Sequence, residues 1–176
     1  YSGMICFAGK ASNGWKLTPA ANWENDWGGI GTLIEEAPSL ILVEKGENLT
    51  NYSKNTYQVS FNTSTLTLNM SQGHDTWGIV GVYNNWGDTP DTEMVLASDV
   101  EYGKRQYYLT ATLYLKADEG WKIRPDNTWT NDRGPDQLKY EGVEVLDGNF
   151  IVTEDGNYTI KWYFNKVEEK LVVFQN

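Results

Sequence analysis

The stretch Gly14-Trp-Lys-Leu-Thr-Pro19 returns later in the chain as Gly120-Trp-Lys-Ile-Arg-Pro125, 106 positions further on. The loop that follows each copy repeats at the same offset, as Asn22-Trp-Glu-Asn-Asp-Trp-Gly28 and Thr128-Trp-Thr-Asn-Asp-Arg-Gly134. Matches that keep their order and spacing indicate an internal repeat of one structural unit. The sequence therefore predicts two related modules rather than one large domain.

The match continues to the end of each copy but not to its beginning. Tyr57-Gln-Val59 recurs as Tyr158-Thr-Ile160, now 101 positions apart, so the second copy has the shorter intervening loop. Several apolar segments between residues 77 and 112 precede the second copy, whereas only residues 1–4 precede the first. The first copy therefore lacks the counterparts of the two opening strands.

We accordingly expect two unequal domains. Residues 1–72 form the C-terminal part of a first β-sandwich module, and residues 73–176 form a complete second module. The stretch 71–76 is the predicted boundary, because it is short and polar. A module without its opening strands either leaves an open sheet edge or takes strands from another molecule.

The local pattern is that of β-strands throughout. Between Tyr107 and Lys116, polar and tyrosine side chains alternate with leucine and alanine, which is the period of a half-buried strand. Segments 157–164 and 170–174 flank a short polar loop, as in a hairpin. Short strands separated by Gly, Asn and Asp predict an all-β protein of tandem immunoglobulin-like β-sandwich modules, the first lacking its N-terminal strands.

Composition narrows the class of protein. Of the 176 residues, 40% are hydrophobic and 22% are charged, which is typical of a folded domain. A net charge of -10 disfavours nucleic acid as a partner, because phosphates attract clustered Lys and Arg. No run approaches the roughly 20 apolar residues that span a bilayer. Cys6 and His74 are each the single residue of their type and cannot form a zinc cluster, so we expect no metal and no cofactor.

Residues for catalysis are scarce, and we predict that the protein is not an enzyme. The acidic pairs Glu35-Glu36, Asp118-Glu119 and Glu168-Glu169 have no apolar surroundings that would raise a carboxyl pKa, so we interpret them as solvated charges. No nucleophile-elbow or phosphate-loop motif occurs, and His74 is interpreted as a surface residue of the linker. Four aspartates fit no calcium-loop spacing and are interpreted as turn formers, namely Asp88, Asp91, Asp126 and Asp132.

The tryptophans divide into two groups by their neighbours. Side chains alternate along a strand, so Trp121 and Ile123 are expected to face the core while Lys122 and Arg124 face outward. The same reasoning assigns Trp15 to the core of the first module. The loop tryptophans have Asn, Asp, Thr and Gly as neighbours and are expected to be exposed for binding, namely Trp23, Trp27, Trp86 and Trp129.

A saccharide is the partner that exposed indoles favour. Its C–H face packs on the electron-rich face of an indole, while Lys, Asn, Asp or Arg at the edge hydrogen-bond to hydroxyls. Each such hydrogen bond replaces a bond to water at a net gain of about 1 kcal/mol, so we expect dissociation constants between μM and mM. Two modules in one chain then add avidity.

Four motifs of the second copy occur together in a known family. They are Gly81-Val-Tyr-Asn-Asn-Trp-Gly87, the strand ending in Trp121-Lys-Ile-Arg124, the loop Asn127-Thr-Trp-Thr-Asn-Asp-Arg-Gly134, and Asp155-Gly-Asn-Tyr-Thr-Ile160 before a final hairpin. In this order they resemble the carbohydrate-binding modules of SusE/SusF-type outer-membrane lipoproteins. The resemblance covers residues 77–176 fully and 5–70 without the leading strands.

The resemblance implies a location and a partner. Proteins of this type lie on the outer surface of Gram-negative gut bacteria of the Bacteroidetes type, held by a lipid anchor that would lie outside this chain. They perform no chemistry and hold α-glucan near an outer-membrane transporter. Starch is therefore the default partner, and related surface proteins bind other glycans.

The resemblance also assigns binding residues. In the second module the aromatic platform falls on Trp86 and Trp129, and the polar partners are Lys122 and Arg124. Asp132 completes this set as a hydrogen-bonding residue at the edge.

The first module carries only part of this set. Its matching positions are Trp23 and Lys16, with Trp27 where the second module has Arg133. No residue matches Trp86, and Thr18 replaces the arginine. Whether the first module binds is left open.

Two other hypotheses compete with glycan capture. The modules could be spacers that position another subunit, with their loop tryptophans packed as lids, or they could belong to an enzyme or a protein-binding adhesin. Two indoles on one surface, about one sugar unit apart and with a lysine at the edge, would favour capture over spacing.

Overall fold

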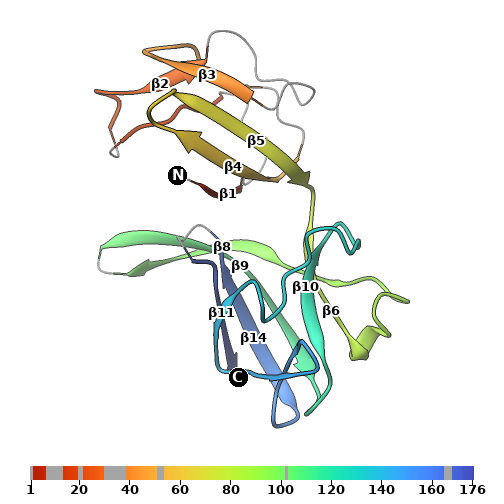
Figure 1. Ribbon diagram of the computed structural model, residues 1–176. Helices are drawn as coiled ribbons and strands as arrows, with labels where there is room; N and C mark the ends of the chain where they lie inside the picture. The colour runs from red at the N-terminus through yellow and green to blue at the C-terminus, as the bar shows by residue number, and fades with distance from the viewer. Residues whose placement is uncertain are drawn as a thin grey trace. The chain divides into compact units, whose positions relative to one another are not determined.

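The computed structural model describes residues 2–6, 14–19, 22–29, 39–50, 54–101, 103–164 and 168–176. They fall into two compact units, residues 1–74 and 75–176, and each unit is described by itself. Within the described residues the regular structure is β-strand apart from one 3-10 turn, η1 (Val82–Asn84) (Figure 1). The all-β prediction with β-sandwich modules is confirmed.

The first unit contains one five-stranded antiparallel sheet in the order β1-β4-β5-β3-β2. The strands are β1 (Ser2–Cys6), β2 (Trp27–Gly29), β3 (Ser39–Glu44), β4 (Thr56–Asn62) and β5 (Thr67–His74). Alternate side chains of these strands meet in a small core made of Leu42, Leu49, Tyr57, Val59, Leu68 and Met70. Trp15 and Leu17 pack against this core and are only half buried.

The second unit is a sandwich of two five-stranded sheets. One has the order β12-β13-β10-β6-β7 and the other β11-β15-β14-β9-β8. The strands of the first sheet are β6 (Trp77–Gly81), β7 (Thr92–Glu93), β10 (Trp121–Pro125), β12 (Glu144–Leu146) and β13 (Asn149–Ile151). Those of the second are β8 (Val95–Glu101), β9 (Lys104–Leu115), β11 (Lys139–Glu141), β14 (Gly156–Tyr163) and β15 (Lys170–Gln175).

Large side chains from both sheets fill this sandwich. Trp121 and Ile123 of β10 are fully buried, as predicted, and so are Trp162 and Ile160 of β14. The predicted alternation is present in β9 from Leu109 to Leu115, whereas Tyr108, expected on the opposite face from Leu109, is buried as well. β14 and β15 form the predicted antiparallel hairpin. Residues 165–167 of the hairpin loop lie outside the described residues.

The repeat is visible in the backbone pairing. Trp15 bridges Leu49 in the first unit as Trp121 pairs with Phe150 in the second. Leu17 bridges Trp27 as Ile123 bridges Arg133. Equivalent residues therefore make equivalent backbone contacts, which supports the division into two related modules.

The N-terminal strand of the first unit is β1, which pairs with β4 as β9 pairs with β14. In the second unit β10 also pairs with β6, a strand that is buried along its whole length. Within the described part of the first unit, no strand holds this position beside residues 15–17. The two units therefore differ beside the tryptophan strand, as far as the described residues go.

The division between the two units, after His74, lies within the predicted boundary 71–76, but the first four of these residues are strand rather than loop. β5 continues to His74, because Ser71 and His74 pair with Gln58 and Thr56 of β4. His74 was expected on the surface, yet it is only 9% exposed. A polar composition marks a loop only when no neighbouring strand offers backbone partners, and here β4 offers them.

No helix among the described residues is long and apolar enough to cross a membrane. The acidic pair Glu35-Glu36 lies outside the residues that the structure describes.

Candidate functional site

The loop that carries Trp86 follows β6 and is held by a buried asparagine. Asn84 accepts a hydrogen bond from the Gly81 N–H (3.0 Å) and donates through Nδ2 to the Thr89 carbonyl (3.2 Å). The Trp86 N–H donates to the Gly81 carbonyl (2.9 Å). Trp86 itself has a φ of +57°. Such a backbone costs a bulky residue about 1–2 kcal/mol, so the surrounding contacts must hold it.

The loop that carries Trp129 begins where β10 ends at Pro125. Asp126 and Asn127 both have positive φ, and the Thr128 N–H donates to the Pro125 carbonyl (2.8 Å). Asp126 accepts the N–H groups of Asp75 and Thr76, each at 2.9 Å, which ties the turn to the chain entering β6. The sharp turn brings Trp129 to the surface, where it is 49% exposed.

The two loops bring Trp86 and Trp129 together, and we call this pair the indole platform. The ring centroids are 6.0 Å apart and the ring planes meet at 42°. Trp86 is half buried. The platform is therefore a bent aromatic surface rather than a flat one.

Arg124 is buried, although it was expected to face outward. Its neighbours Trp121 and Ile123 are in the core, yet Arg124 itself is only 4% exposed, because Asp91, Gly87 and Trp129 of the two loops lie against it. Its Nε and Nη2 donate to the two carboxylate oxygens of Asp91 at 2.6 and 2.8 Å. Its Cζ lies 4.7 Å from the centroid of the Trp129 ring. Arg124 was expected to be exposed, and the structure shows instead that Asp91 and the Trp129 ring contact its guanidinium.

Lys122 and Asp132 form a separate half-buried pair. The Lys122 ammonium lies 3.6 Å from an Asp132 carboxylate oxygen. Lys122 lies on the same side of β10 as Arg124 and two residues away, which is about 7 Å along a strand. An amine and a carboxylate thus stand beside the platform with part of their surface open to solvent.

In the first unit the equivalent pair is tighter and has a third member. The Lys16 ammonium donates to Asp26 at 2.8 Å, and Lys45 donates to the other carboxylate oxygen at 3.0 Å. These hydrogen bonds hold the pKa of the Asp26 carboxyl below its usual value, and their effect outweighs that of burial. Lys45 also donates to the Trp23 carbonyl (2.7 Å), and the Trp23 side chain is 68% exposed.

Trp27 was expected on the surface beside Trp23, and the structure contradicts this. It opens β2, exchanges backbone hydrogen bonds with Leu17 at 2.9 and 3.0 Å, and packs half buried against the first core. Its equivalent, Arg133, lies over the Trp77 ring at 5.5 Å and pairs with Glu169 at 3.0 Å. In both units, the side chain at this position therefore packs against buried residues of the core.

Sequence reasoning missed the residues that support the platform. Asn84 was quoted only as part of a motif, and Asp91 was interpreted as a turn former. Tyr83 donates through its hydroxyl to the Ile79 carbonyl and lies 3.0 Å from the Thr92 hydroxyl, which fastens the loop to β6 and β7. Burial raises the pKa of the Tyr83 hydroxyl. The only signal in the sequence was the density of Asn, Asp and Gly between residues 81 and 91.

Among the described residues, no group of three or more His, Cys, Asp or Glu side chains could hold a metal ion. The chemistry that the site offers is stacking on two indoles and hydrogen bonding at one edge.

Comparison with known proteins yields one similarity. No protein-family model matches the chain, and no curated protein sequence matches it. Among solved structures, the chain is similar to the crystal structure of SusF from Bacteroides thetaiotaomicron, with 15% identity and a TM-score of 0.44. The match covers 87% of this chain and 36% of that chain, so this chain is much shorter than SusF.

Proposed function

We propose that the chain binds a polysaccharide without catalysis, and that the ligand stacks on Trp86 and Trp129 of the second module. The observation that carries the proposal is the indole platform, with ring centroids 6.0 Å apart and Trp129 half exposed. Two indoles on one surface at about the spacing of one sugar unit are what glycan capture needs. A spacer whose tryptophans are packed as lids would bury both rings.

The angle of the platform supports a curved chain. Because the two ring planes meet at 42°, sugar units that lie flat on each ring must themselves be inclined to each other. Consecutive units of an α-glucan are inclined in this way, whereas a flat β-1,4-linked chain would need two nearly coplanar rings. An α-glucan such as starch is therefore the proposed ligand.

Lys122 and Asp132 supply the polar contacts. The amine donates hydrogen bonds to sugar hydroxyls and the carboxylate accepts them, and the pair separation of 3.6 Å leaves both groups with unused bonding capacity. Such bonds add orientation more than affinity, because each replaces a bond to water. Binding at one platform is expected between μM and mM.

The family resemblance also supports a proposal about where in the cell the protein lies. We infer that the protein lies on the outer surface of a Gram-negative bacterium, held by a lipid anchor. There it would keep glycan close to an outer-membrane transporter. The first module, through the exposed Trp23, would contribute a weaker second contact through avidity.

The test is the affinity of the full chain for soluble glycans, measured by calorimetry and by retardation in glycan-containing gels. Amylopectin and maltoheptaose represent curved chains, while hydroxyethyl cellulose and cellohexaose represent flat ones. Trp129→Ala is expected to weaken α-glucan binding by about 2 kcal/mol or more, which is roughly thirtyfold. Tyr107→Ala is the matched control, because it removes another exposed aromatic ring of the second module.

Unchanged α-glucan binding in Trp129→Ala would refute the platform as the binding surface. If the unmodified chain bound no glycan of either class, the spacer hypothesis would replace glycan capture.

A further inference from the structure

We infer that Arg124 and Asp91 are positioning residues: their ion pair holds Trp129 at its angle to Trp86, and this angle selects curved over flat glycan chains. The choice of ligand rests on the proposed function. The positioning itself is a property of the unbound protein, so it can be tested without a ligand.

Arg124 lies at the junction of the two loops that carry the platform. Its guanidinium faces the Trp129 ring at 4.7 Å. It also lies directly against Gly87, because a Cβ on that glycine would come within 2.4 Å of Arg124 Nη2. One side chain therefore touches the ring of one indole and the chain neighbour of the other. If Arg124 turned, the relation between the two loops would change.

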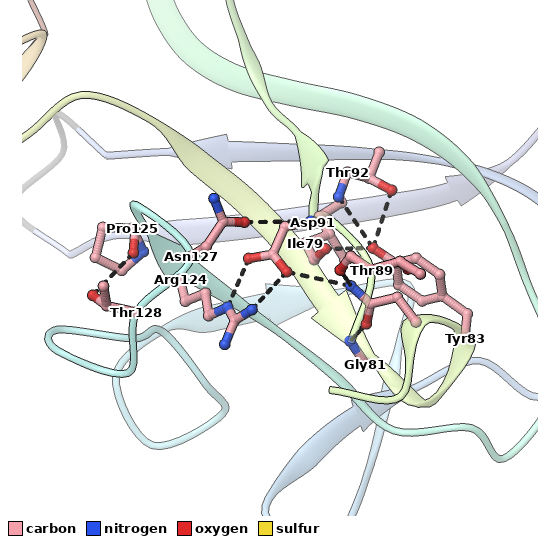
Figure 2. A network of polar contacts seen from close by, with 11 residues as sticks. Ile79, Gly81, Tyr83, Thr89, Asp91, Thr92, Arg124, Pro125, Asn127 and Thr128 are labelled. Atoms are coloured by element: carbon pink, nitrogen blue, oxygen red, sulfur yellow. Dashed lines mark hydrogen bonds and ion pairs between the residues drawn. The ribbon is translucent and has the colours of Figure 1, made fainter. Parts of the chain in front are cut away.

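Asp91 prevents that turn. Two parallel hydrogen bonds, at 2.6 and 2.8 Å, fix both the position and the plane of the guanidinium (Figure 2). Asp91 is fixed in turn, because Asn84 donates to its carboxylate (3.3 Å) and the Asn127 side chain accepts its N–H (3.3 Å). Asn84 belongs to the Trp86 loop and Asn127 to the Trp129 loop, so this network joins both loops to β10.

A flat guanidinium suits this role better than an ammonium. It stacks face to face on an aromatic ring and at the same time offers its edge to a carboxylate, which a lysine amine cannot do. Since the guanidinium occupies one face of the Trp129 ring, a ligand can reach only the opposite face. The pair thus sets both the tilt of the ring and the side from which it binds.

The first module provides an internal comparison. Thr18 stands at the position of Arg124, and Trp23 stands at the position of Trp129. There Lys45 holds the backbone of the loop through the Trp23 carbonyl, and the indole is 68% exposed. An indole on the same loop is thus more exposed where no guanidinium stands at the Arg124 position.

The experiment uses the full chain and reads the platform by circular dichroism. Two indoles at 6.0 Å and a fixed angle give an exciton couplet, isolated as the difference between the unmodified protein and Trp86→Ala. The buried pair Trp77–Trp162 is present in both proteins, so its couplet cancels. Arg124→Lys keeps the charge but loses the flat fork. It should lose most of the couplet and bind maltoheptaose about tenfold more weakly, the equivalent of about 1.4 kcal/mol.

Two further variants keep the test decisive. Arg105→Lys is the control, because Arg105 is an exposed arginine of β9 whose partner is the Ser98 hydroxyl (3.3 Å), and it should leave couplet and affinity unchanged. The double variant D91L/R124M replaces the buried pair by apolar side chains of similar size, which removes the risk of an unpaired buried charge. It should melt cooperatively, lose the couplet, and reduce the preference for maltoheptaose over cellohexaose.

An intact couplet and unchanged preference in both Arg124→Lys and D91L/R124M would overturn the positioning role, even if Trp129→Ala abolishes binding. If neither the unmodified protein nor any variant bound glycan, the proposed function would be refuted. The positioning role would still be decided, because the exciton couplet is measured without a ligand.

Discussion

The two modules carry the same lysine and aspartate at equivalent positions but use them differently. In the second, Lys122 and Asp132 are 3.6 Å apart beside a platform of two indoles, one of them stacked on Arg124. In the first, two lysines donate to Asp26 at 2.8 and 3.0 Å, and the Trp23 side chain is 68% exposed. The longer Lys122–Asp132 pair leaves both groups able to hydrogen-bond a ligand. The two short pairs to Asp26 instead stabilise the loop of the first module.

The comparison also shows what the opening strands contribute. β6 pairs with β10 in the same sheet and leads directly into the loop that carries Trp86 and Asn84. Asp91 follows in the same segment before β7. A module without this segment would therefore lack one indole, the carboxylate partner of Arg124, and the strand that pairs with β10.

The largest expected contrast is in the two core tryptophans. Trp121 is fully buried and lies 5.0 Å from the Phe150 ring, so Trp121→Ala should cost about 3–5 kcal/mol of unfolding free energy. Trp15→Ala should cost about half as much or less, because the half-buried ring loses less area. Urea denaturation followed by NMR signals of each module measures both. Equal losses would show that the first core is as well covered as the second.

A second contrast lies in the number of indoles. Trp86→Ala leaves the second module with one exposed indole, as in the first, and should weaken α-glucan binding about tenfold. Trp23→Ala should change the affinity of the full chain by less than about twofold, since a single-indole site contributes little. Calorimetry with maltoheptaose compares them. A larger effect of Trp23→Ala would mean that the first module is the main site.

These contrasts indicate how far the sequence could go. The repeat, the strand pattern and the burial of Trp121 were predictable, because alternation and spacing are local properties. The burial of Arg124 was not predictable, because alternation tells on which side of β10 a side chain lies but not whether loops cover that side. Its partner Asp91 is 33 positions away, and nothing local to either residue signals the pairing.

Trp27 and His74 were misjudged for a related reason. Both stand in polar stretches, and a polar stretch was taken as evidence of exposure. Backbone pairing with Leu17 and with Thr56 places them in strands, where the packing of the sheet rather than the polarity of the sequence neighbours decides burial. Exposure of loop tryptophans was correctly predicted for Trp23 and Trp129, where no strand captures the segment.

A smaller effect is expected from pH. Hydrogen bonds from Lys16 and Lys45 lower the folded-state pKa of Asp26 below 3.8, so their stabilisation is full above that pH and is lost as the pH falls through the folded value. In the second module Asp99 raises the pKa of Lys161 above 10.5, so that stabilisation is full below pH 10.5 and is lost at higher pH. NMR of each module during acid and alkaline titration measures both. Lys45→Met should flatten the acid response of the first module, and an unchanged response would contradict the clamp.

The smallest expected effect separates the two lysines at the equivalent position. Lys122→Met should weaken α-glucan binding about threefold, because one hydroxyl contact of about 1 kcal/mol or less is lost while the platform stays. Lys16→Met should leave glycan affinity unchanged and reduce only the stability of the first module, since its amine is already committed to Asp26 at 2.8 Å. Both substitutions keep a long unbranched side chain, so packing of the stem is matched. If Lys16→Met weakened binding as much as Lys122→Met, the clamp on Asp26 would have to open for a ligand, and the two edges would be functionally alike.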